Sequence, residues 1–246
     1  MNHRINQMNG QTILENLRDK LQPDTVKHIS KIWKPPTAAL NVPEIATNGR
    51  KVERVTLATL DTSHPEVKTA VNTARAWGKR KADTPEISLV LCGNYGTGKT
   101  HIAKAILWSI CYTMDGEPVA PIGKFFLAND LIQLMKAGNS PRELIGDAPI
   151  LVIDDVGSEQ NIEFIAAKLQ DRELEGRYFR IVDYCNQHNI SVIVTSNLLP
   201  SGDDESKGVA QVMGGRAWSR LMEMAPKGFV VTLFGVDDYR VKRSGR

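Results

Sequence analysis

Short apolar runs alternate with helix-patterned segments over most of the chain after residue 51. Five of these runs have the length and the apolar, β-branched composition of buried strands. They are Ile87–Cys92, Lys124–Leu127, Ile150–Ile153, Ser191–Thr195 and Phe229–Phe234. A helix is predicted around residues 65–79, and strands separated by helical segments are typical of βαβ crossovers. The pattern therefore predicts an α/β fold, a mostly parallel five-stranded sheet with helices on both faces.

The first 50 residues have a different pattern. Apolar residues recur at helical spacing over two short segments, and Lys34-Pro35-Pro36 ends the second of them. Residues 35–50 are rich in Pro, Thr, Ala and Asn without clear periodicity, which is typical of a linker. We predict a small helical module with its linker over 1–50 and one main domain over 51–246. Two helices bury little surface alone, so we expect them to pack on the main domain or on another protein.

Composition places the chain among ordinary globular proteins, with 41% hydrophobic and 24% charged residues. No segment approaches the roughly 20 apolar residues of a membrane span. The start, Met1-Asn2-His3-Arg4, lacks the apolar run of a signal peptide. Three widely spaced cysteines fit neither a disulfide framework nor a zinc motif. These observations exclude membrane and secreted classes and predict a cytoplasmic protein.

The net charge of +3 is unevenly distributed. Residues 1–88 carry 14 Lys and Arg against 9 Asp and Glu, a balance of +5, and the remainder carries 17 against 19, a balance of −2. A basic N-terminal third is compatible with a nucleic-acid or acidic-protein partner. Solvated surface charge explains it equally well.

The sequence GNYGTGKT over residues 93–100 fits the Walker A pattern GxxxxGK[ST] in full. It follows an apolar strand and precedes a helical run, so glycines and a helix N-terminus can direct backbone N–H groups at a phosphate. We predict ATP as the ligand, with Lys99 reaching the β- and γ-phosphates and the Thr100 hydroxyl on Mg²⁺. The predicted nucleotide-binding residues are Gly93, Asn94, Tyr95, Gly96, Thr97, Gly98, Lys99, Thr100 and His101.

Two further strands end in polar residues. The apolar strand that starts at Ile150 ends in Asp154 and Asp155, the form of a Walker B motif. Asp154 is predicted to hold Mg²⁺ through water, and Asp155 to polarise the water that attacks the γ-phosphate. Asn197 follows the next strand and is a candidate sensor of the γ-phosphate, although Ser-Asn after a strand is also a common turn.

These motifs, in this order, resemble those of AAA+ ATPases. Four segments narrow the resemblance to the bacterial replicative-helicase loaders of the DnaC/DnaI type and the related transposition helper IstB. They are Asp154-Asp155-Val156-Gly157, Arg177–Tyr184, Ser219-Arg220-Leu221 and Gly235–Arg240. The resemblance covers roughly residues 55–240.

The resemblance implies a P-loop AAA+ core with no C-terminal lid domain, an ATP-dependent spiral oligomer, and two partners. The partners are a hexameric DnaB-type helicase, bound through residues 1–50, and single-stranded DNA. Arg220 is implied to act on the nucleotide of the neighbouring subunit, with Arg216 as the competing candidate. The candidate DNA contacts are Lys136, Arg142 and Phe164, of which Phe164 fits a core position equally well.

We therefore predict an ATPase of low turnover that loads a hexameric replicative helicase onto single-stranded DNA during replication initiation. An IstB-like helper that binds DNA and a transposase shares every catalytic residue, and binding of duplex DNA with stimulation by a transposase would favour it. A non-hydrolysing helicase adaptor or inhibitor is the other alternative. Biological activity that survives Lys99→Ala or Asp155→Asn would favour the adaptor.

Overall fold

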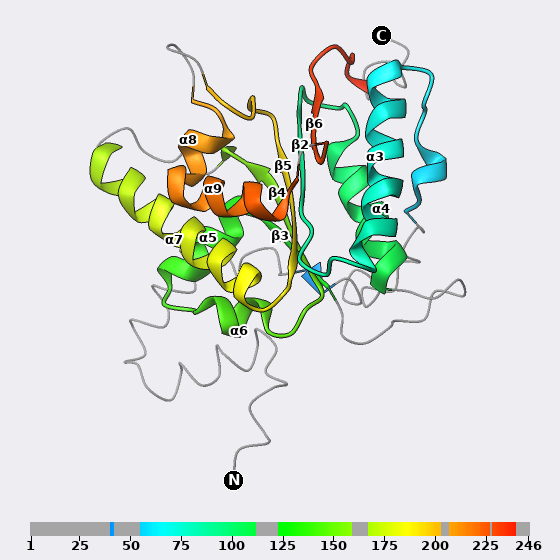
Figure 1. Ribbon diagram of the computed structural model, residues 1–246. Helices are drawn as coiled ribbons and strands as arrows, with labels where there is room; N and C mark the ends of the chain where they lie inside the picture. The colour runs from blue at the N-terminus through cyan, green and yellow to red at the C-terminus, as the bar shows by residue number, and fades with distance from the viewer. Residues whose placement is uncertain are drawn as a thin grey trace, which may run out of the picture. The chain divides into compact units, whose positions relative to one another are not determined.

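The apolar runs form the strands of one six-stranded sheet (Figure 1). The computed structural model describes residues 40–41, 55–111, 123–158, 167–202, 207–226 and 228–239. The strands are β1 (Leu40–Asn41), β2 (Leu89–Gly93), β3 (Lys124–Leu127), β4 (Ile150–Val156), β5 (Ser191–Ser196) and β6 (Val230–Leu233). Their order across the sheet is β1-β3-β4-β5-β2-β6. Only β1 is antiparallel to its neighbour among these strands.

The prediction of a mostly parallel five-stranded sheet is confirmed by β2 to β6. The two-residue strand β1 adds an antiparallel edge on β3, within the segment that we interpreted as a linker. The two helices predicted before Lys34 lie outside the described residues.

Helices cover both faces of the sheet in Figure 1, with α3 and α4 on one side and α5, α7, α8 and α9 on the other. The helical segments are η2 (Leu57–Thr59), α3 (Pro65–Lys81), α4 (Lys99–Cys111), α5 (Ala128–Lys136), α6 (Pro141–Ile145), α7 (Ala167–Gln187), α8 (Val209–Met213) and α9 (Gly215–Met224). Within the described ranges, no helix combines the length and the apolarity that crossing a membrane requires.

Each face of the sheet has its own apolar core. Every residue of β2 and β5 is buried, as expected for parallel strands that helices cover on both sides. On the α3 side, Trp77 is fully buried, and its indole N–H donates to the carbonyl oxygen of Ile87 at 3.2 Å. This bond satisfies the polar atom of a side chain that otherwise supplies apolar contact area.

The sheet order brings three strand ends together. Because β5 lies between β4 and β2, the carboxyl ends of these three strands are neighbours at one edge of the sheet. Ligands of open parallel sheets bind at this edge, outside the carboxyl ends of the strands. The Walker A loop, the Walker B carboxylates and Asn197 all emerge there.

Candidate active site

The loop between β2 and α4 depends on glycines at two positions. The φ angle is 71° at Gly96 and 93° at Gly98, a region that residues with side chains rarely adopt. A Cβ atom on Gly96 would collide with the carboxylate of Asp238, and one on Gly98 would lie 3.1 Å from Cδ2 of Leu60. The positive φ angles therefore favour glycine at both positions of the Walker A pattern, and a side chain at either one would also have to displace Asp238 or Leu60.

Lys99 lies at the first position of α4 and is 6% exposed. Its ammonium group donates to the carbonyl oxygens of Gly93 at 2.8 Å and Asn94 at 2.7 Å. It also donates to Oδ1 of Asn197 at 2.9 Å. These bonds hold a cation at the loop and tie the end of β2 to the residue that follows β5.

Asp154 is buried at the end of β4 and accepts two hydroxyl hydrogen bonds. Thr100 Oγ1 donates to Asp154 Oδ1 at 2.9 Å, and Thr195 Oγ1 donates to the same oxygen at 2.6 Å. The Thr195 hydroxyl in turn accepts the backbone N–H of Asp155 at 2.9 Å. Thr195 thus fixes both carboxylate-bearing residues. The sequence analysis did not assign it a role, because it reads as the last residue of an apolar strand.

Replacing Thr195 by valine is expected to lower both stability and hydrolysis. The isosteric side chain leaves the backbone N–H of Asp155 without a partner and removes one donor to Asp154. An unsatisfied buried polar group costs about 1–3 kcal/mol. Chemical denaturation and steady-state ATP hydrolysis measure the two effects, and Thr195→Ser, which keeps the hydroxyl, should retain most of both. Valine and serine variants of equal stability and activity would refute this role.

Asp155 and Asn197 form the second polar pair of the site. Asn197 Nδ2 donates to Asp155 Oδ1 at 2.6 Å, so Asn197 bridges Lys99 and Asp155 through its two amide atoms. Asp155 has a φ of 62°, an uncommon backbone conformation that aspartate and asparagine tolerate best. Burial, followed by the charge of Asp154, raises the pKa of the Asp155 carboxyl, and Lys99 partly opposes the rise. A carboxylate of raised pKa at the end of a strand is suited to accept a proton.

A cavity of about 670 Å³ contains these groups, which is within the usual size of small-ligand sites. Its walls come from the phosphate loop, the ends of β4 and β5, the segment around η2, the start of α3 and residues 236–239. The predicted residues that line it are Tyr95, Gly96, Thr97, Gly98, Lys99, Thr100, His101, Asp154, Asp155 and Asn197. Gly93 and Asn94 lie outside the lining, and the Asn94 amide instead donates to the Phe234 carbonyl at 2.9 Å.

His101 joins the phosphate-loop helix to the segment around η2. Its Nε2 lies 2.9 Å from Thr59 Oγ1 and 3.2 Å from the Thr56 carbonyl oxygen. The lining on this side also includes Val55, Leu60 and the start of α3, which the sequence analysis did not assign to the site. No local sequence pattern identifies these residues as part of the site, because they reach the phosphate loop only through the packing of α3 beside α4.

Comparison with known proteins identifies the family of the chain. A family model of the bacterial DnaA ATPase domain matches residues 64–205, more than half of the chain. The chain belongs to the bacterial DnaA ATPase domain family. The predicted AAA+ fold is confirmed, and membership of this family supports nucleotide binding and ATPase activity in general.

Two solved structures extend the comparison of this AAA+ chain. The DnaC helicase loader is 26% identical with a TM-score of 0.53, covering 73% of this chain and 96% of that chain. DnaI is 18% identical with a TM-score of 0.51, covering 75% of this chain and 90% of that chain, and at this identity it shows the fold alone. No curated protein matches the chain.

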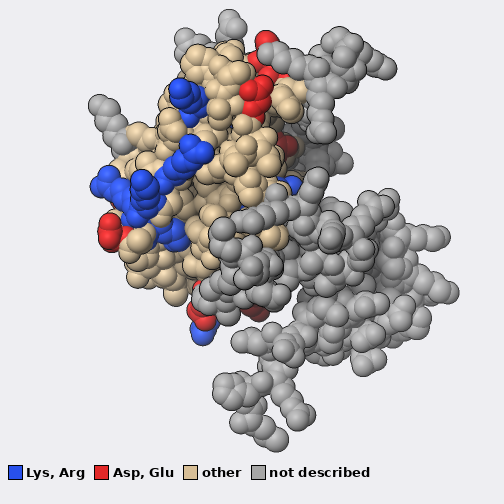
Figure 2. Space-filling view, turned by 90° about the vertical axis from the view of Figure 1, so that its right-hand side faces the viewer, with Lys and Arg blue, Asp and Glu red and all other residues tan. Residues whose placement is uncertain are grey.

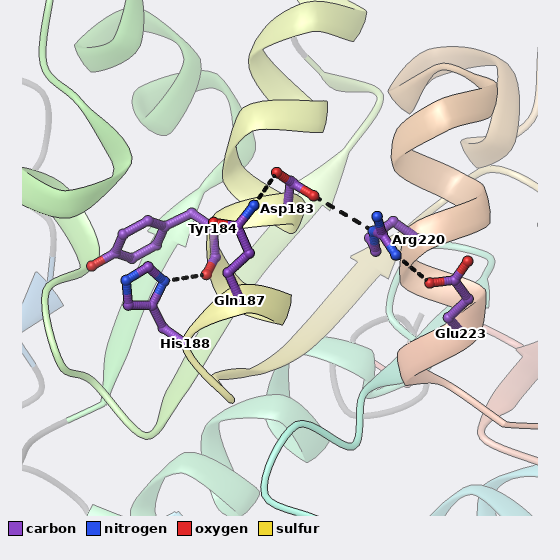
Figure 3. Close-up of polar contacts among 6 residues, drawn as sticks. All are labelled: Asp183, Tyr184, Gln187, His188, Arg220 and Glu223. Atoms are coloured by element: carbon purple, nitrogen blue, oxygen red, sulfur yellow. Dashed lines mark hydrogen bonds and ion pairs between the residues drawn. The ribbon is translucent and has the colours of Figure 1, made fainter.

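Arg220 of this AAA+ chain lies on α9, outside the residues that line the cavity of its own chain. Figure 3 shows its guanidinium between two carboxylates. Nη1 is 2.6 Å from Glu223 Oε2, and Nε is 3.5 Å from Asp183 Oδ1 of α7. The competing candidate, Arg216, lies over the ring of Phe179 at 3.9 Å from its centroid.

Two of the candidate DNA contacts, Lys136 and Arg142, do not line the cavity. Lys136 is exposed at the end of α5, and Arg142 is exposed on α6. Phe164 lies outside the described residues.

Proposed function

We propose that this protein loads a hexameric replicative helicase onto single-stranded DNA, using ATP, in the cytoplasm. The observation that carries the proposal is the similarity to the DnaC helicase loader, which extends over 96% of that chain at 26% identity. The polar cluster at the ends of β2, β4 and β5 supports the proposal, because it contains the cation and the carboxylates that the proposed hydrolysis uses.

The proposed reaction is attack of water on the γ-phosphorus. The water oxygen bonds to phosphorus, the bond from phosphorus to the bridging oxygen of ADP breaks, and the water proton passes to Asp155. Asn197 holds the Asp155 carboxylate through its 2.6 Å hydrogen bond and orients it toward the water. Lys99 offsets the negative charge on the phosphate oxygens as the bond to ADP breaks. The products are ADP and inorganic phosphate, and turnover is slow because the reaction serves as a switch.

The site fits a bound Mg²⁺. The Thr100 hydroxyl and the Asp154 carboxylate lie 2.9 Å apart, and both are the hard oxygen ligands that Mg²⁺ takes beside substrate phosphates. When bound, Mg²⁺ would neutralise charge on the β- and γ-phosphates. Thr195 would keep the Asp154 carboxylate oriented toward it.

Arg220 is proposed to complete the site of the neighbouring subunit. Mixing two inactive variants tests this directly, because Arg220→Ala keeps its own Lys99 and Lys99→Ala keeps its own Arg220. In a mixed oligomer, an Arg220→Ala site beside a Lys99→Ala subunit regains both groups. Hydrolysis should therefore return on mixing. A mixture as inactive as its components would contradict action between subunits.

Residues 1–50 are proposed to bind the helicase, and Lys136, Arg142 and Phe164 to contact single-stranded DNA within a spiral oligomer. Light scattering with size exclusion tests the first assignment, on a mixture of the protein, its host's replicative helicase and ATP. The full chain should give a defined complex, and a chain without residues 1–50 should not. No complex at micromolar concentrations would move the transposition helper to first place.

A further inference from the structure

The helix α3 carries an unusual concentration of positive charge. Its cationic residues are Lys68, Arg75, Lys79, Arg80 and Lys81. Its only acidic residue is Glu66, in the first turn, whose Oε2 accepts the backbone N–H of Gly235 at 3.1 Å. The one acidic side chain of α3 is therefore hydrogen-bonded at the N-terminal end of the helix, and the five cationic residues follow it along the helix.

Three of these cations lie in one stripe on the outer surface of α3. Lys68, Arg75 and Lys79 are separated by seven and four residues, spacings that place side chains on the same side of an α-helix. All three are exposed, whereas the residues of α3 that face the core include the fully buried Trp77. We call Lys68, Arg75 and Lys79 the α3 stripe.

The α3 stripe has no counter-charge among the described residues. No ion pair or hydrogen bond joins its three side chains to another part of the described structure. Lys81, by contrast, donates to the Pro149 carbonyl at 2.9 Å and to Ser191 Oγ at 2.7 Å. Figure 2 looks onto the side that carries α3 and α4, and Lys and Arg side chains gather on part of this face. The stripe can therefore neutralise an external polyanion without first breaking internal pairs.

We propose that the α3 stripe binds the phosphate backbone of duplex DNA. The stripe spans 11 residues, or about 16 Å of helix, and a DNA strand presents one phosphate per about 3.4 Å of duplex axis. Single-strand binding relies on exposed aromatic side chains for base stacking, and α3 offers none, since Trp77 is buried. The choice of DNA over an acidic protein rests on the proposed function.

This surface is separate from the predicted single-strand contacts. Lys136 and Arg142 belong to α5 and α6, and α5 covers the opposite face of the sheet (Figure 1). A loader with both surfaces would contact the duplex that borders the single strand on which it acts, whereas duplex binding that a transposase stimulates would favour the transposition helper.

Fluorescence anisotropy with a fluorescein-labelled duplex and a single strand of the same sequence tests the proposal. It uses the full chain without helicase, at several salt concentrations. The variant Arg75→Gln/Lys79→Gln should weaken duplex binding on the order of ten-fold and lower the slope of log K against log salt by about 2. A charge-matched control, Arg172→Gln/Arg180→Gln on α7, should leave both unchanged, and Arg75→Lys alone should bind as the unmodified chain does.

Each other result overturns the proposal. These results are no duplex binding by the unmodified chain, equal losses in the α3 variant and the α7 control, or a loss confined to the single strand. If the unmodified chain binds labelled polyglutamate but not the duplex, and Arg75→Gln/Lys79→Gln loses the polyglutamate binding, the stripe binds an acidic protein instead. Helicase loading that persists in the α3 variant would leave the proposed function standing while duplex binding fails, so the two failures are distinguishable.

Discussion

Lys99→Ala is expected to abolish ATP hydrolysis, with a loss on the order of 10³-fold or more in kcat/KM. Lys99 is the cation that three oxygen atoms hold at the phosphate loop, at 2.7 to 2.9 Å from Nζ. Its removal leaves these three oxygen atoms without their shared donor and takes the positive charge away from the predicted phosphate site. Nucleotide affinity should fall together with hydrolysis. Equilibrium binding of a fluorescent ATP analogue measures the affinity, and phosphate release measures hydrolysis.

Lys104→Ala is the matched control for this variant. Lys104 lies five residues further along α4, and its ammonium group lies 5.2 Å from the ring centroid of Phe125, away from the loop. It should retain hydrolysis and nucleotide affinity. If Lys99→Ala keeps full nucleotide affinity and hydrolysis, the assignment of the phosphate site is wrong. If Lys99→Ala loses both nucleotide affinity and hydrolysis and still supports biological activity, the result favours the non-hydrolysing adaptor.

Asp155→Asn is expected to reduce hydrolysis by about 10²–10⁴-fold while ATP still binds. Asparagine can keep the hydrogen bond from Asn197 and the left-handed backbone of this position, but it cannot take a proton from water. The proposed oligomer should therefore remain in its ATP-bound state. Single-turnover experiments measure the loss of hydrolysis, and equilibrium binding measures the retained affinity for ATP. Asp147→Asn, at an exposed position, is the control. A variant that hydrolyses ATP at the normal rate would show that another group accepts the proton.

The same substitution should stabilise the fold. The pKa of Asp155 is raised, so ionising it costs more in the folded chain than in the unfolded chain, and its contribution to stability falls as pH rises through that pKa. Asparagine carries no such cost. The melting temperature of Asp155→Asn should exceed that of the unmodified chain at neutral pH, and the difference should shrink in acid. The acid limb of the pH–rate profile should likewise lie at higher pH than for an ordinary carboxyl.

Local sequence predicts the central features of the site because each depends on neighbouring residues. Gly96, Gly98 and Lys99 form a loop whose conformation and charge follow from their spacing after a strand. The paired aspartates are visible because two acids at the end of an apolar strand have few structural explanations. The five parallel strands follow in the same way from the alternation of apolar and helical segments.

Features that depend on long-range packing could not be predicted. The role of Thr195 arises only because β5 lies between β2 and β4, an order that no local pattern specifies. The Asp183 partner of Arg220 likewise depends on the packing of α7 against α9. The α3 stripe was visible in the sequence only as a diffuse basic balance over residues 1–88, until the helix placed its charges on one side.

Retention of a hexameric replicative helicase on closed circular single-stranded DNA tests the proposed loader function most directly. A preformed ring can reach a closed circle only if it is opened, so retention reports loading and not threading over an end. The full chain with ATP should increase the retained helicase, and omission of the protein or removal of residues 1–50 should abolish the increase. Equal retention with and without the protein, at concentrations where the two proteins bind each other, would contradict the loader function.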